Sequence, residues 1–424
     1  MVSHRSIGPS LGRREVLRSS LAMGGALGLQ ACADGRVASV SSSPTSGHAL
    51  RPLLTPMRVT PDQLIDVKCC LRPLRAAGPN LSTETVGDTL VVHNYGHGGS
   101  GWSLSWGSAE VAVGKALTVL PKEIAVIGCG IIGLTAAVVA QRAGLKVTIY
   151  ARDMIPRTRS FRASGSFTPD SRIALGEAAG PGFGDLWEQM ARLSWKTFRT
   201  YLGLPSNPVE FVDSYAVSEN PISRREWEPD PSVAGSFVTT GMPQQNSEFA
   251  RYSSRIRDIV PQSQPIPREE SPFDMPYTTR ASSMHFNFAS YAHLLTSEFF
   301  ERGGRFENRV IHAPGDVSAL PQKVVIHATG FAARDLWHDR TVIPVRGQTG
   351  WLPPQDQCKY GLRYKNASIQ YKSDGMVIMN NPVETGEMFG VGDSMELPMR
   401  DPILEAMAIL ASVFAAMPDP ARRY

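Results

Sequence analysis

The stretch that decides the fold runs from Lys122 to Asp153, KEIAVIGCGIIGLTAAVVAQRAGLKVTIYARD. It starts with a short apolar run, IAVI, of the kind that forms a buried parallel strand. Gly128, Gly130 and Gly133 follow with the spacing G-x-G-x-x-G, and an apolar helical run leads to a second strand-like run, KVTIY. In this context the glycines permit a tight turn, a close backbone approach to a pyrophosphate, and close packing of helix on strand. The stretch therefore predicts a strand–helix–strand unit that binds a dinucleotide at the amino end of its helix.

The end of the second strand-like run is unusual for a nicotinamide enzyme. An acidic residue normally stands there to bind the ribose hydroxyls, but here Arg152 comes first and Asp153 follows it. This order weakens a simple NAD-binding interpretation. Arg152 is expected either to hold a phosphate group or to lie over the face of an adenine ring.

The composition is that of a globular protein. The chain has 424 residues, enough for two or three domains, with 42% hydrophobic and 19% charged residues. Its net charge of +4 is small, and the arginines are scattered rather than arranged in a basic stripe, so nucleic-acid binding is not indicated. The adjacent Cys69 and Cys70 have the spacing of neither a metal site nor a redox pair, and no metal site is predicted.

Residues 1–32 are set apart from the fold as an export signal. They contain the pair Arg13 and Arg14, then a short, moderately apolar run that ends at Cys32. This pattern is typical of the twin-arginine route, and its end resembles a lipoprotein cleavage box with Cys32 as the lipidated residue. We expect a periplasmic bacterial protein, or one attached to a membrane through Cys32 alone. The alternative is a basic N-terminus with a chance arginine pair. Residues 33–65 are expected to be a flexible linker, and no later segment has the length and apolarity of a transmembrane helix.

Motifs along the rest of the chain point to one family. VIGCGIIGLTAA is followed by IYARDMIPRTRSFRASGSF, and VVIHATGFAARDLWHDRTVIPVRGQ begins at Val324. RPLR at residues 72–75 and HNYGHGGSG at residues 93–101 add two more. Together they resemble the D-amino-acid oxidase family, FAD enzymes with a glutathione-reductase-like fold, over most of residues 68–417. The resemblance implies FAD as cofactor, and a small amino acid and dioxygen as substrates.

The resemblance also assigns the FAD-binding residues by motif. They come from the glycine loop, the end of the second strand, the hydroxyl-rich turn after it, a Thr-Gly turn and the glycine-rich run that follows His97. Arg159 departs from the pattern, because many members have threonine at its position. The implied residues are Gly128, Gly130, Ile132, Gly133, Arg152, Asp153, Thr158, Ser160, Ala163, Ser164, Gly165, Thr329, Gly330, Gly98, Gly101, Trp102 and Ser103.

The order of these motifs differs from that of the family. In the family, Arg-Pro-x-Arg and the His-Asn-Tyr-Gly string lie near the C-terminus, whereas here both precede the glycine loop. We interpret this order as a circular permutation, in which the family's last segment comes first and is joined to the glycine loop through the helix-like residues 108–123. The alternative is an error of assembly or of the gene model.

The resemblance implies three residues for the reaction. Arg72 would hold the substrate carboxylate, because a guanidinium offers a bidentate and permanently charged partner. Tyr371 would help to hold it, the alternative being a strand aromatic packed on its neighbours. Met376 stands near the usual place of a second tyrosine, which leaves the substrate open. Gly99 and its neighbouring glycines would let backbone approach the flavin and the substrate.

The implied reaction is FAD-dependent oxidative deamination of a D-amino acid by hydride transfer to flavin N5. It gives a 2-oxo acid, ammonia and hydrogen peroxide. It needs no base, so His93 and His97 are expected to be structural, hydrogen-bonding residues. Two alternatives stay open: an oxidase of glycine, D-aspartate or another secondary or cyclic amino acid, and a FAD-binding protein without catalysis.

The expected fold class is α/β, with a Rossmann-like FAD-binding domain and a smaller α+β substrate domain that has a mixed or antiparallel sheet. The amphipathic spacing of Tyr291, Leu295 and Phe299 predicts a helix. The expected FAD-binding domain covers residues 66–175, made of the permuted segment 66–120 and residues 121–175. Residues 176–290 are expected to mix FAD-domain helices with the substrate domain. Residues 291–345 are expected to return to the FAD domain, and 346–424 to form the substrate-domain sheet and the final helix.

Overall fold

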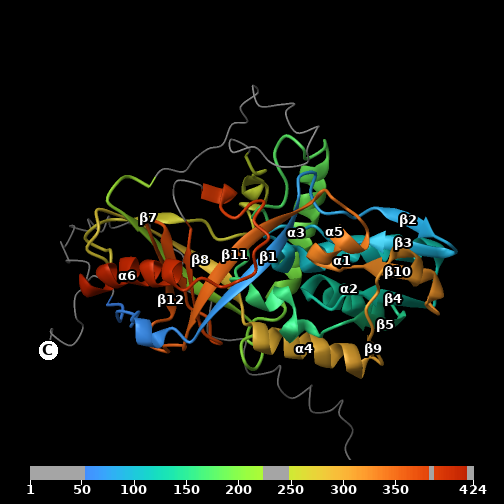
Figure 1. Cartoon of the computed structure of the whole chain (residues 1–424). Helices are drawn as coiled ribbons and strands as arrows, with labels where there is room; N and C mark the ends of the chain where they lie inside the picture. The colour runs from blue at the N-terminus through green and yellow to red at the C-terminus, as the bar shows by residue number, and fades with distance from the viewer. Residues whose placement is uncertain (1–52, 223–247, 382–385, 418–424) are drawn as a thin grey trace, which may run out of the picture. The chain divides into compact units, whose positions relative to one another are not determined.

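Two β-sheets and the helices packed on them make up the part of the chain that the computed structural model describes, residues 53–222, 248–381 and 386–417 (Figure 1). The predicted export signal and the start of the predicted linker lie outside the described residues. The expected fold class is confirmed, because one sheet is largely parallel and carries helices, and the other is mixed but largely antiparallel.

The six-stranded sheet has the order β2-β3-β10-β4-β5-β9. All neighbours are parallel except β2, which forms a hairpin with β3. The strand and helix predicted around the glycine loop are confirmed as β4, α2 and β5. The strands are β2 (Thr83–Val86), β3 (Thr89–His93), β4 (Glu123–Ile127), β5 (Lys146–Ala151), β9 (Arg305–Asn308) and β10 (Val324–His327).

Helices cover one face of this sheet. They are α1 (Gly101–Ala116), α2 (Ile131–Arg142) and the predicted helix α4 (Phe288–Glu301), which share an apolar core with the strands (Figure 1). Alternate strand residues point to the two faces: Ile124 and Val126 meet the helices, whereas Ala125 and Ile127 meet the short helix α5 (Ala333–Leu336) and the loop before β10. Both faces of β4 are thus buried, which explains its unbroken apolar sequence.

A fourth helix, α3 (Phe183–Arg199), crosses close to α1. A Cβ on Gly107 of α1 would overlap the backbone of Met190 in α3, so glycine permits the close approach. The Gly107 amide also donates a hydrogen bond to Ser194 Oγ at 2.9 Å. This contact joins the middle of α1 to α3.

The eight-stranded sheet has the order β1-β11-β14-β13-β12-β6-β8-β7. Its neighbours are antiparallel except β12 and β6. The helix α6 (Asp401–Ala415) packs on β12 to β14 and encloses a second apolar core. The strands are β1 (Asp66–Arg75), β6 (Val209–Ser218), β7 (Gln264–Ile266), β8 (Tyr277–Phe286), β11 (Val342–Leu352), β12 (Tyr360–Tyr364), β13 (Ala367–Gln370) and β14 (Met376–Asn380).

The segment that contains RPLR and HNYGHGGSG joins the two sheets. β1 pairs with β11 along its whole length, from Asp66 opposite Trp351 to Arg75 opposite Val342. Residues 66–75 therefore lie in the eight-stranded sheet. β3, by contrast, pairs with β10 inside the six-stranded sheet. None of the described helices is long and apolar enough to cross a membrane.

Candidate active site

A cavity of about 690 Å³ lies at the carboxyl ends of β4, β5 and β10. Its wall is formed by residues 128–132 after β4, 150–153 at the end of β5 and 328–332 after β10. Residues 70–73 of β1 and the glycine-rich run after β3 complete it. Ligands of open parallel sheets bind at the carboxyl ends of the strands, where the direction of strand order changes. This cavity has that position.

Close backbone contacts shape the glycine turn after β4. Gly128 has φ of +98°, and a Cβ there would lie 2.5 Å from the carbonyl oxygen of Ala328. A Cβ on Gly133 would overlap the Gly128 carbonyl, so α2 packs directly against the turn. The amide of Ile131, at the start of α2, donates to Ser160 Oγ at 3.0 Å. The turn and the helix terminus together form a cradle suited to an anion such as a pyrophosphate.

The cavity wall carries an excess of positive charge. Two of its arginines, Arg159 and Arg162, are paired with Glu396, whose Oε2 lies 3.1 Å from Arg159 Nε and 3.2 Å from Arg162 Nη1. Hydrogen bonding from Arg159, more than any other contact, lowers the pKa of the Glu396 carboxyl. The wall therefore suits a ligand with several negative charges. Its charged residues are Arg72, Arg152, Arg157, Arg159, Arg162, Arg309, Asp153, Asp335 and Glu396.

Arg72 projects from β1 across the neighbouring strand β11. A Cβ on Gly347 would overlap the Arg72 guanidinium, so the missing side chain makes room for it. Arg72 Nη1 lies 3.5 Å from the carbonyl oxygen of Arg346, and no carboxylate in the described part of the chain pairs with it. Arg346 itself is 2% exposed and donates to the carbonyls of Met395 and Leu397 at 3.0 and 2.7 Å. Arg346 is thus fully engaged, whereas Arg72 is available to an anion.

Comparison with known proteins identifies the family of this chain. The sequence model of the DAO family, FAD dependent oxidoreductase, matches residues 123–421. The chain belongs to this family of FAD-dependent oxidoreductases. It is 27% identical over 230 residues to a D-amino-acid oxidase of Streptomyces coelicolor, covering 53% of this chain and 58% of that one. It is 46% identical over 52 residues to a D-aspartate oxidase of Cryptococcus neoformans var. grubii, covering 12% and 13%.

A solved structure with a related arrangement is an L-amino acid deaminase from Proteus vulgaris with its specific insertion sequence deleted. Its TM-score is 0.46 at 14% identity, covering 70% of this chain and 76% of that one. This FAD-dependent oxidoreductase spans a little over half the length of the Streptomyces relative that it matches, 58%. The activity and substrate of the whole protein are therefore taken up as proposals below.

The residues present fit the FAD that the family requires. Gly128 and Gly133 let the turn, α2 and the segment after β10 pack closely, and the turn and the first residues of α2 line the cavity. The arginines around the wall provide the positive charge that a diphosphate needs. The glycine turn and the amino end of α2 would hold the pyrophosphate of FAD.

Most of the predicted site residues are brought together in this oxidoreductase. Trp102 Nε1, for example, donates to the Ser160 carbonyl at 2.9 Å, which links the glycine-rich run to the hydroxyl-rich turn. The predicted residues on the cavity wall are Arg72, Gly98, Gly99, Gly101, Trp102, Gly128, Gly130, Ile132, Arg152, Asp153, Thr158, Ser160, Ala163, Thr329 and Gly330.

Other predicted residues lie away from the wall. Ser103 Oγ accepts a hydrogen bond from the Thr168 amide at 2.8 Å, so it fixes a neighbouring loop. Tyr371 is 2% exposed in the second core, and its hydroxyl donates to Asp356 Oδ1 at 3.4 Å. Its surroundings are those of a packed strand-end aromatic, the alternative that the sequence left open. The predicted residues outside the wall are Gly133, Ser103, Ser164, Gly165 and Tyr371.

Two glycines of HNYGHGGSG that line the cavity also lie against a neighbouring loop. A Cβ on Gly98 would overlap the carbonyl oxygen of Arg172, and a Cβ on Gly99 would lie 2.7 Å from that of Ser171. Their missing side chains therefore admit a neighbouring loop. Gly101 is different, because a Cβ there would meet nothing closer than His97 Cβ at 3.9 Å.

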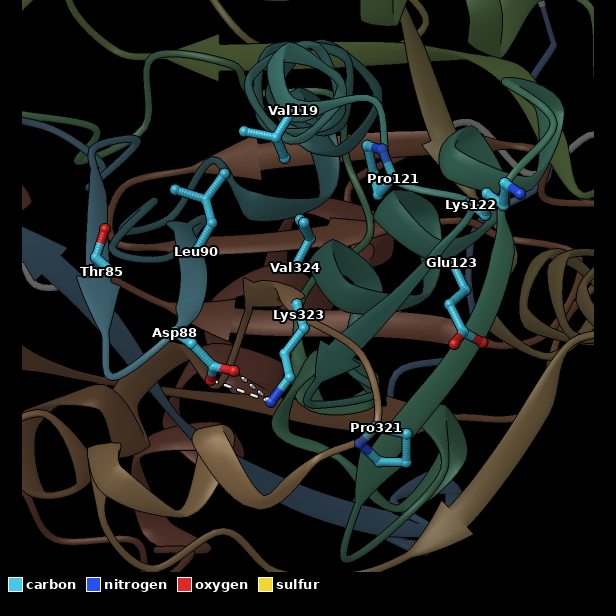
Figure 2. A pocket seen from close by; sticks show the side chains of 10 residues that line it. All are labelled: Thr85, Asp88, Leu90, Val119, Pro121, Lys122, Glu123, Pro321, Lys323 and Val324. Atoms are coloured by element: carbon cyan, nitrogen blue, oxygen red, sulfur yellow. Dashed lines mark hydrogen bonds and ion pairs between the residues drawn. The ribbon is translucent and has the colours of Figure 1, made fainter.

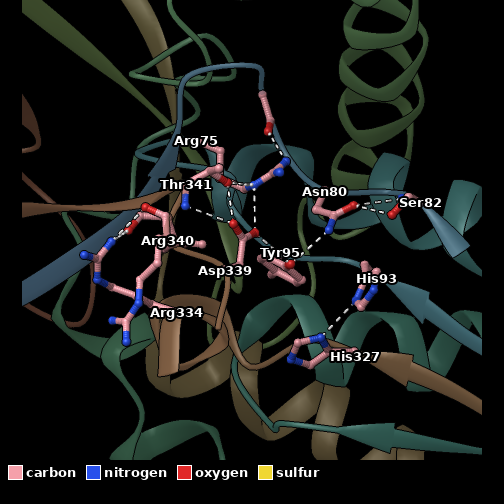
Figure 3. Close-up of polar contacts among 12 residues, drawn as sticks. Arg75, Asn80, Ser82, His93, Tyr95, His327, Arg334, Asp339, Arg340 and Thr341 are labelled. Carbon is pink, nitrogen blue, oxygen red and sulfur yellow. Dashed lines mark hydrogen bonds and ion pairs between the residues drawn. The ribbon is translucent and has the colours of Figure 1, made fainter. Parts of the chain in front are cut away.

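His93 takes the structural role that was predicted. Its Nδ1 lies 3.0 Å from Nδ1 of His327 (Figure 3). Its Nε2 lies 3.1 Å from Glu84 Oε1. His327 Nε2 in turn lies 2.7 Å from Thr329 Oγ1 on the cavity wall. Burial lowers the pKa of both rings, and His93 further lowers that of His327, so the pair is neutral and holds Thr329 in place.

His97 differs from the prediction, because its Nε2 has no hydrogen-bond partner among the described residues. Burial alone lowers its pKa to about 3. Arg75 forms an ion pair with Asp339, with 3.1 Å between Nε and Oδ2, and the Tyr95 hydroxyl donates to the same carboxylate (Figure 3). None of these side chains therefore provides a proton acceptor inside the cavity at neutral pH.

Sequence reasoning missed two parts of the site. Arg309 lies on the wall because it follows β9, whose carboxyl end borders β5. Predicting a strand for RFEN, residues 305–308, would have placed Arg309 at this edge of the sheet. Glu396, which pairs with Arg159, is distant in sequence and no local motif marks it. Arg159 was noticed only as a departure from the family pattern.

A second hollow, of about 560 Å³, lies at the opposite ends of the same strands (Figure 2). Its lining includes Leu90, Glu123 and Val324 at the amino ends of β3, β4 and β10, and an ion pair between Asp88 and Lys323. It lacks a glycine turn and a helix amino terminus. The carboxyl-end cavity is therefore the candidate active site.

Proposed function

We propose that this protein catalyses the FAD-dependent oxidative deamination of a D-amino acid, giving a 2-oxo acid, ammonia and hydrogen peroxide. The observation that carries the proposal is Arg72, a guanidinium on the cavity wall that no described carboxylate neutralises. A half-buried, unpaired cation favours an anionic ligand, and a planar guanidinium matches a carboxylate in two parallel hydrogen bonds. The α-carboxylate of an amino acid provides that partner.

The chain's own contribution is to orient the substrate and exclude water. Arg72 would hold the carboxylate over the space left by Gly347, and the apolar side chains of Leu71, Trp102 and Phe331 would surround the rest of the substrate. FAD, when bound, supplies the acceptor for the α-hydrogen as hydride and returns the electrons to dioxygen. Burial lowers the pKa of His97 to about 3, so this ring is too weak a base to take a proton from the substrate ammonium group. The substrate amine must therefore lose its proton to solvent before it reacts.

The experiment is to purify the protein, release and identify its flavin, and measure peroxide with D-amino acids, their L-enantiomers and glycine. Turnover of D- but not L-enantiomers supports the proposal. Turnover restricted to glycine or L-amino acids contradicts it, and FAD without turnover of any amine identifies a binding protein without catalysis.

We also propose that the chain is a circular permutant of its family. The match to the family begins at residue 123, after RPLR and HNYGHGGSG. Residues 57–64, which precede β1, pack in one core with α6, through Leu64 and Ile403 among others. In the family's order a short loop would join the end of α6 to the start of β1. Circular permutation requires such a short distance between the joined ends.

A rearranged gene tests the permutation. Residues 66–120 are moved behind α6 and joined to it through the native linker, and the new chain starts at Pro121. The expected product folds, binds FAD and has the activity of the native order. An insoluble product that binds no flavin would speak against the permutation, whereas one that folds supports it.

We further propose export by the twin-arginine route, from Arg13, Arg14 and Cys32 in the sequence. The measurement is fractionation of cells that express the full chain, compared with a variant in which both arginines are lysine. The native chain should be recovered outside the cytoplasm, and the variant should be retained. Equal distribution of the two forms contradicts the proposal.

A further inference from the structure

A chain of hydrogen bonds runs from the edge of the six-stranded sheet to the cavity wall. Glu84 Oε1, on β2, lies 3.1 Å from Nε2 of His93. His93 Nδ1 lies 3.0 Å from Nδ1 of His327 (Figure 3). His327 Nε2 lies 2.7 Å from Oγ1 of Thr329, which lines the cavity. Both rings are buried, whereas the Glu84 side chain is 43% exposed, so the chain connects a surface carboxyl group with the cofactor cavity.

Trp337 fixes the direction of the first hydrogen bond. Its indole N–H can only donate, and it donates to Glu84 Oε1, so this oxygen is an acceptor. His93 Nε2 faces the same oxygen and must therefore carry a hydrogen. The Trp337 ring also stacks on His327, with 4.0 Å between the ring centroids. Trp337 thus both orients Glu84 and covers His327.

The other hydrogens of the chain follow in order, because a neutral imidazole has one N–H and one acceptor nitrogen. Burial, more than any other influence, lowers the pKa of both rings, so both are neutral at neutral pH. With its hydrogen on Nε2, His93 accepts at Nδ1 from the Nδ1–H of His327. His327 then accepts at Nε2, and the Thr329 hydroxyl donates to it. The single hydrogen of this hydroxyl therefore points to a buried ring and not to a ligand.

Thr329 stands beside the glycine turn of the cavity. A Cβ on Gly128 would lie 3.3 Å from Thr329 Cα. With its hydrogen donated to His327, the Thr329 hydroxyl has only lone pairs to offer to a ligand. A phosphate oxygen is also an acceptor and gains no hydrogen bond from such a group. A hydroxyl of the ribityl chain or of the ribose of FAD can donate to it.

We propose that Thr329 is held as a hydrogen-bond acceptor toward the cavity, so that it binds a hydroxyl group of FAD and not its phosphate oxygens. Glu84, His93 and His327 are the positioning residues. They act on the ligand through Thr329, because they decide which way its hydrogen points. This inference rests on FAD as the cofactor and does not depend on the proposed amino-acid substrate.

Nitrogen-15 NMR of the FAD-loaded protein, labelled at its histidines, tests the direction of the chain. The shifts of the ring nitrogens distinguish the two neutral tautomers. At neutral pH His93 should carry its hydrogen on Nε2, and His327 should carry its hydrogen on Nδ1. His93→Asn and His327→Asn each remove the signals of one ring and thereby assign them. A hydrogen on Nε2 of His327 in the native protein would overturn the proposal.

FAD titration followed by flavin fluorescence measures the effect on the ligand. Glu84→Leu removes the acceptor that orders the chain and should lower FAD affinity by about 2- to 10-fold, the range for one neutral hydrogen bond. Glu84→Gln, whose amide oxygen accepts in the same place, should bind FAD like the native protein. Asp88→Leu is the matched control, because it removes a carboxylate from the same hairpin that pairs with Lys323 and not with a histidine. Native affinity in Glu84→Leu, or an equal loss in Asp88→Leu, would contradict the positioning role.

Thr329→Val separates recognition of a hydroxyl from recognition of a phosphate. Valine has nearly the shape of threonine but no acceptor, so FAD affinity should fall by about 5- to 100-fold, the range for a buried group left without its partner. Thr329→Ser should restore most of it. Inorganic pyrophosphate, measured as a competitor of FAD, should bind native protein and Thr329→Val within about twofold of each other. An equal loss for pyrophosphate and FAD would assign Thr329 to the phosphates and overturn the proposal.

None of these measurements requires turnover. A protein that binds FAD as described but oxidises no D-amino acid would overturn the proposed function and leave the role of the chain supported. An active oxidase with the opposite tautomer at His327 would overturn the role of the chain and leave the proposed function standing.

Discussion

Substitution of Gly133 by alanine should both destabilise the protein and abolish FAD binding. The new Cβ would overlap the Gly128 carbonyl and lie 3.4 Å from Ala328 Cβ, and backbone cannot rotate out of the way as a side chain can. Overpacking of a filled interior costs about 1–3 kcal/mol, and we expect about 3 kcal/mol here because the clash is with backbone. For a chain of this size that corresponds to a fall in Tm of about 3–4 °C.

Gly130→Ala gives the informative contrast. Its backbone, at φ −75°, is open to alanine, and the added Cβ would meet only Ser160 Oγ, at 3.1 Å. This variant should keep the Tm of the native apoprotein within about 2 °C and lose FAD affinity, because its methyl group enters the cradle. Gly114→Ala, in α1 with nothing within 4 Å of the new Cβ, is the control and should be stabilised by up to about 1 kcal/mol.

The assays are thermal unfolding of each apoprotein and titration with FAD followed by flavin fluorescence. The reasoning is refuted if Gly133→Ala retains native stability, or if Gly130→Ala loses as much stability as Gly133→Ala. If Gly130→Ala binds FAD with native affinity, the pyrophosphate of FAD does not bind at the glycine turn.

Three further predictions concern the reaction, the core and the pH dependence of stability. Arg72→Ala should abolish peroxide production from amino acids while bound FAD stays at the native level; turnover near the native rate would exclude Arg72 from carboxylate binding. Tyr371→Phe should keep kcat/KM within about twofold, because the tyrosine lies in a packed core where its hydroxyl interacts with Asp356 and Ser373; a large loss would mean that Tyr371 acts in the active site. Burial lowers the pKa values of His97 and His285 to about 3, below the unfolded value of 6.5. Between these two pH values both rings are protonated in the unfolded state and neutral in the folded state. Stability should therefore fall as pH drops from about 6.5 towards 3, by about 1.4 kcal/mol per pH unit for each ring. Urea unfolding at pH 7 and pH 5 measures this, and His285→Gln should halve the slope due to this pair.

The local patterns were sufficient to predict the elements around the glycine loop. The turn needs φ values that only glycine adopts easily at Gly128, and the following helix needs a glycine at Gly133 to approach the turn. Both requirements are met within a few residues along the chain, so they appear as a motif. The spacing of Tyr291, Leu295 and Phe299 likewise predicted α4, because one buried face imposes a helical period.

Residues whose role depends on distant partners were harder to predict. Tyr371 matched a motif position, yet the second core surrounds it. Gly98 and Gly99 are predicted to approach the flavin, and the structure adds a second requirement for glycine, the packing of the loop that carries Ser171 and Arg172. Glu396 reaches Arg159 from more than two hundred positions away, and neither residue predicts the other.

By itself, the sequence determined the dinucleotide cradle and the family motifs, because these depend on backbone conformation and on contacts within short segments. Only the tertiary structure decided which charges meet in the cavity. Arg72 comes from β1, Arg309 from the segment after β9 and Glu396 from the segment before α6, and none lies near another in sequence. Electrostatic interactions act through space and weaken with distance, so which of these charges are paired follows from how the two sheets bring their ends together.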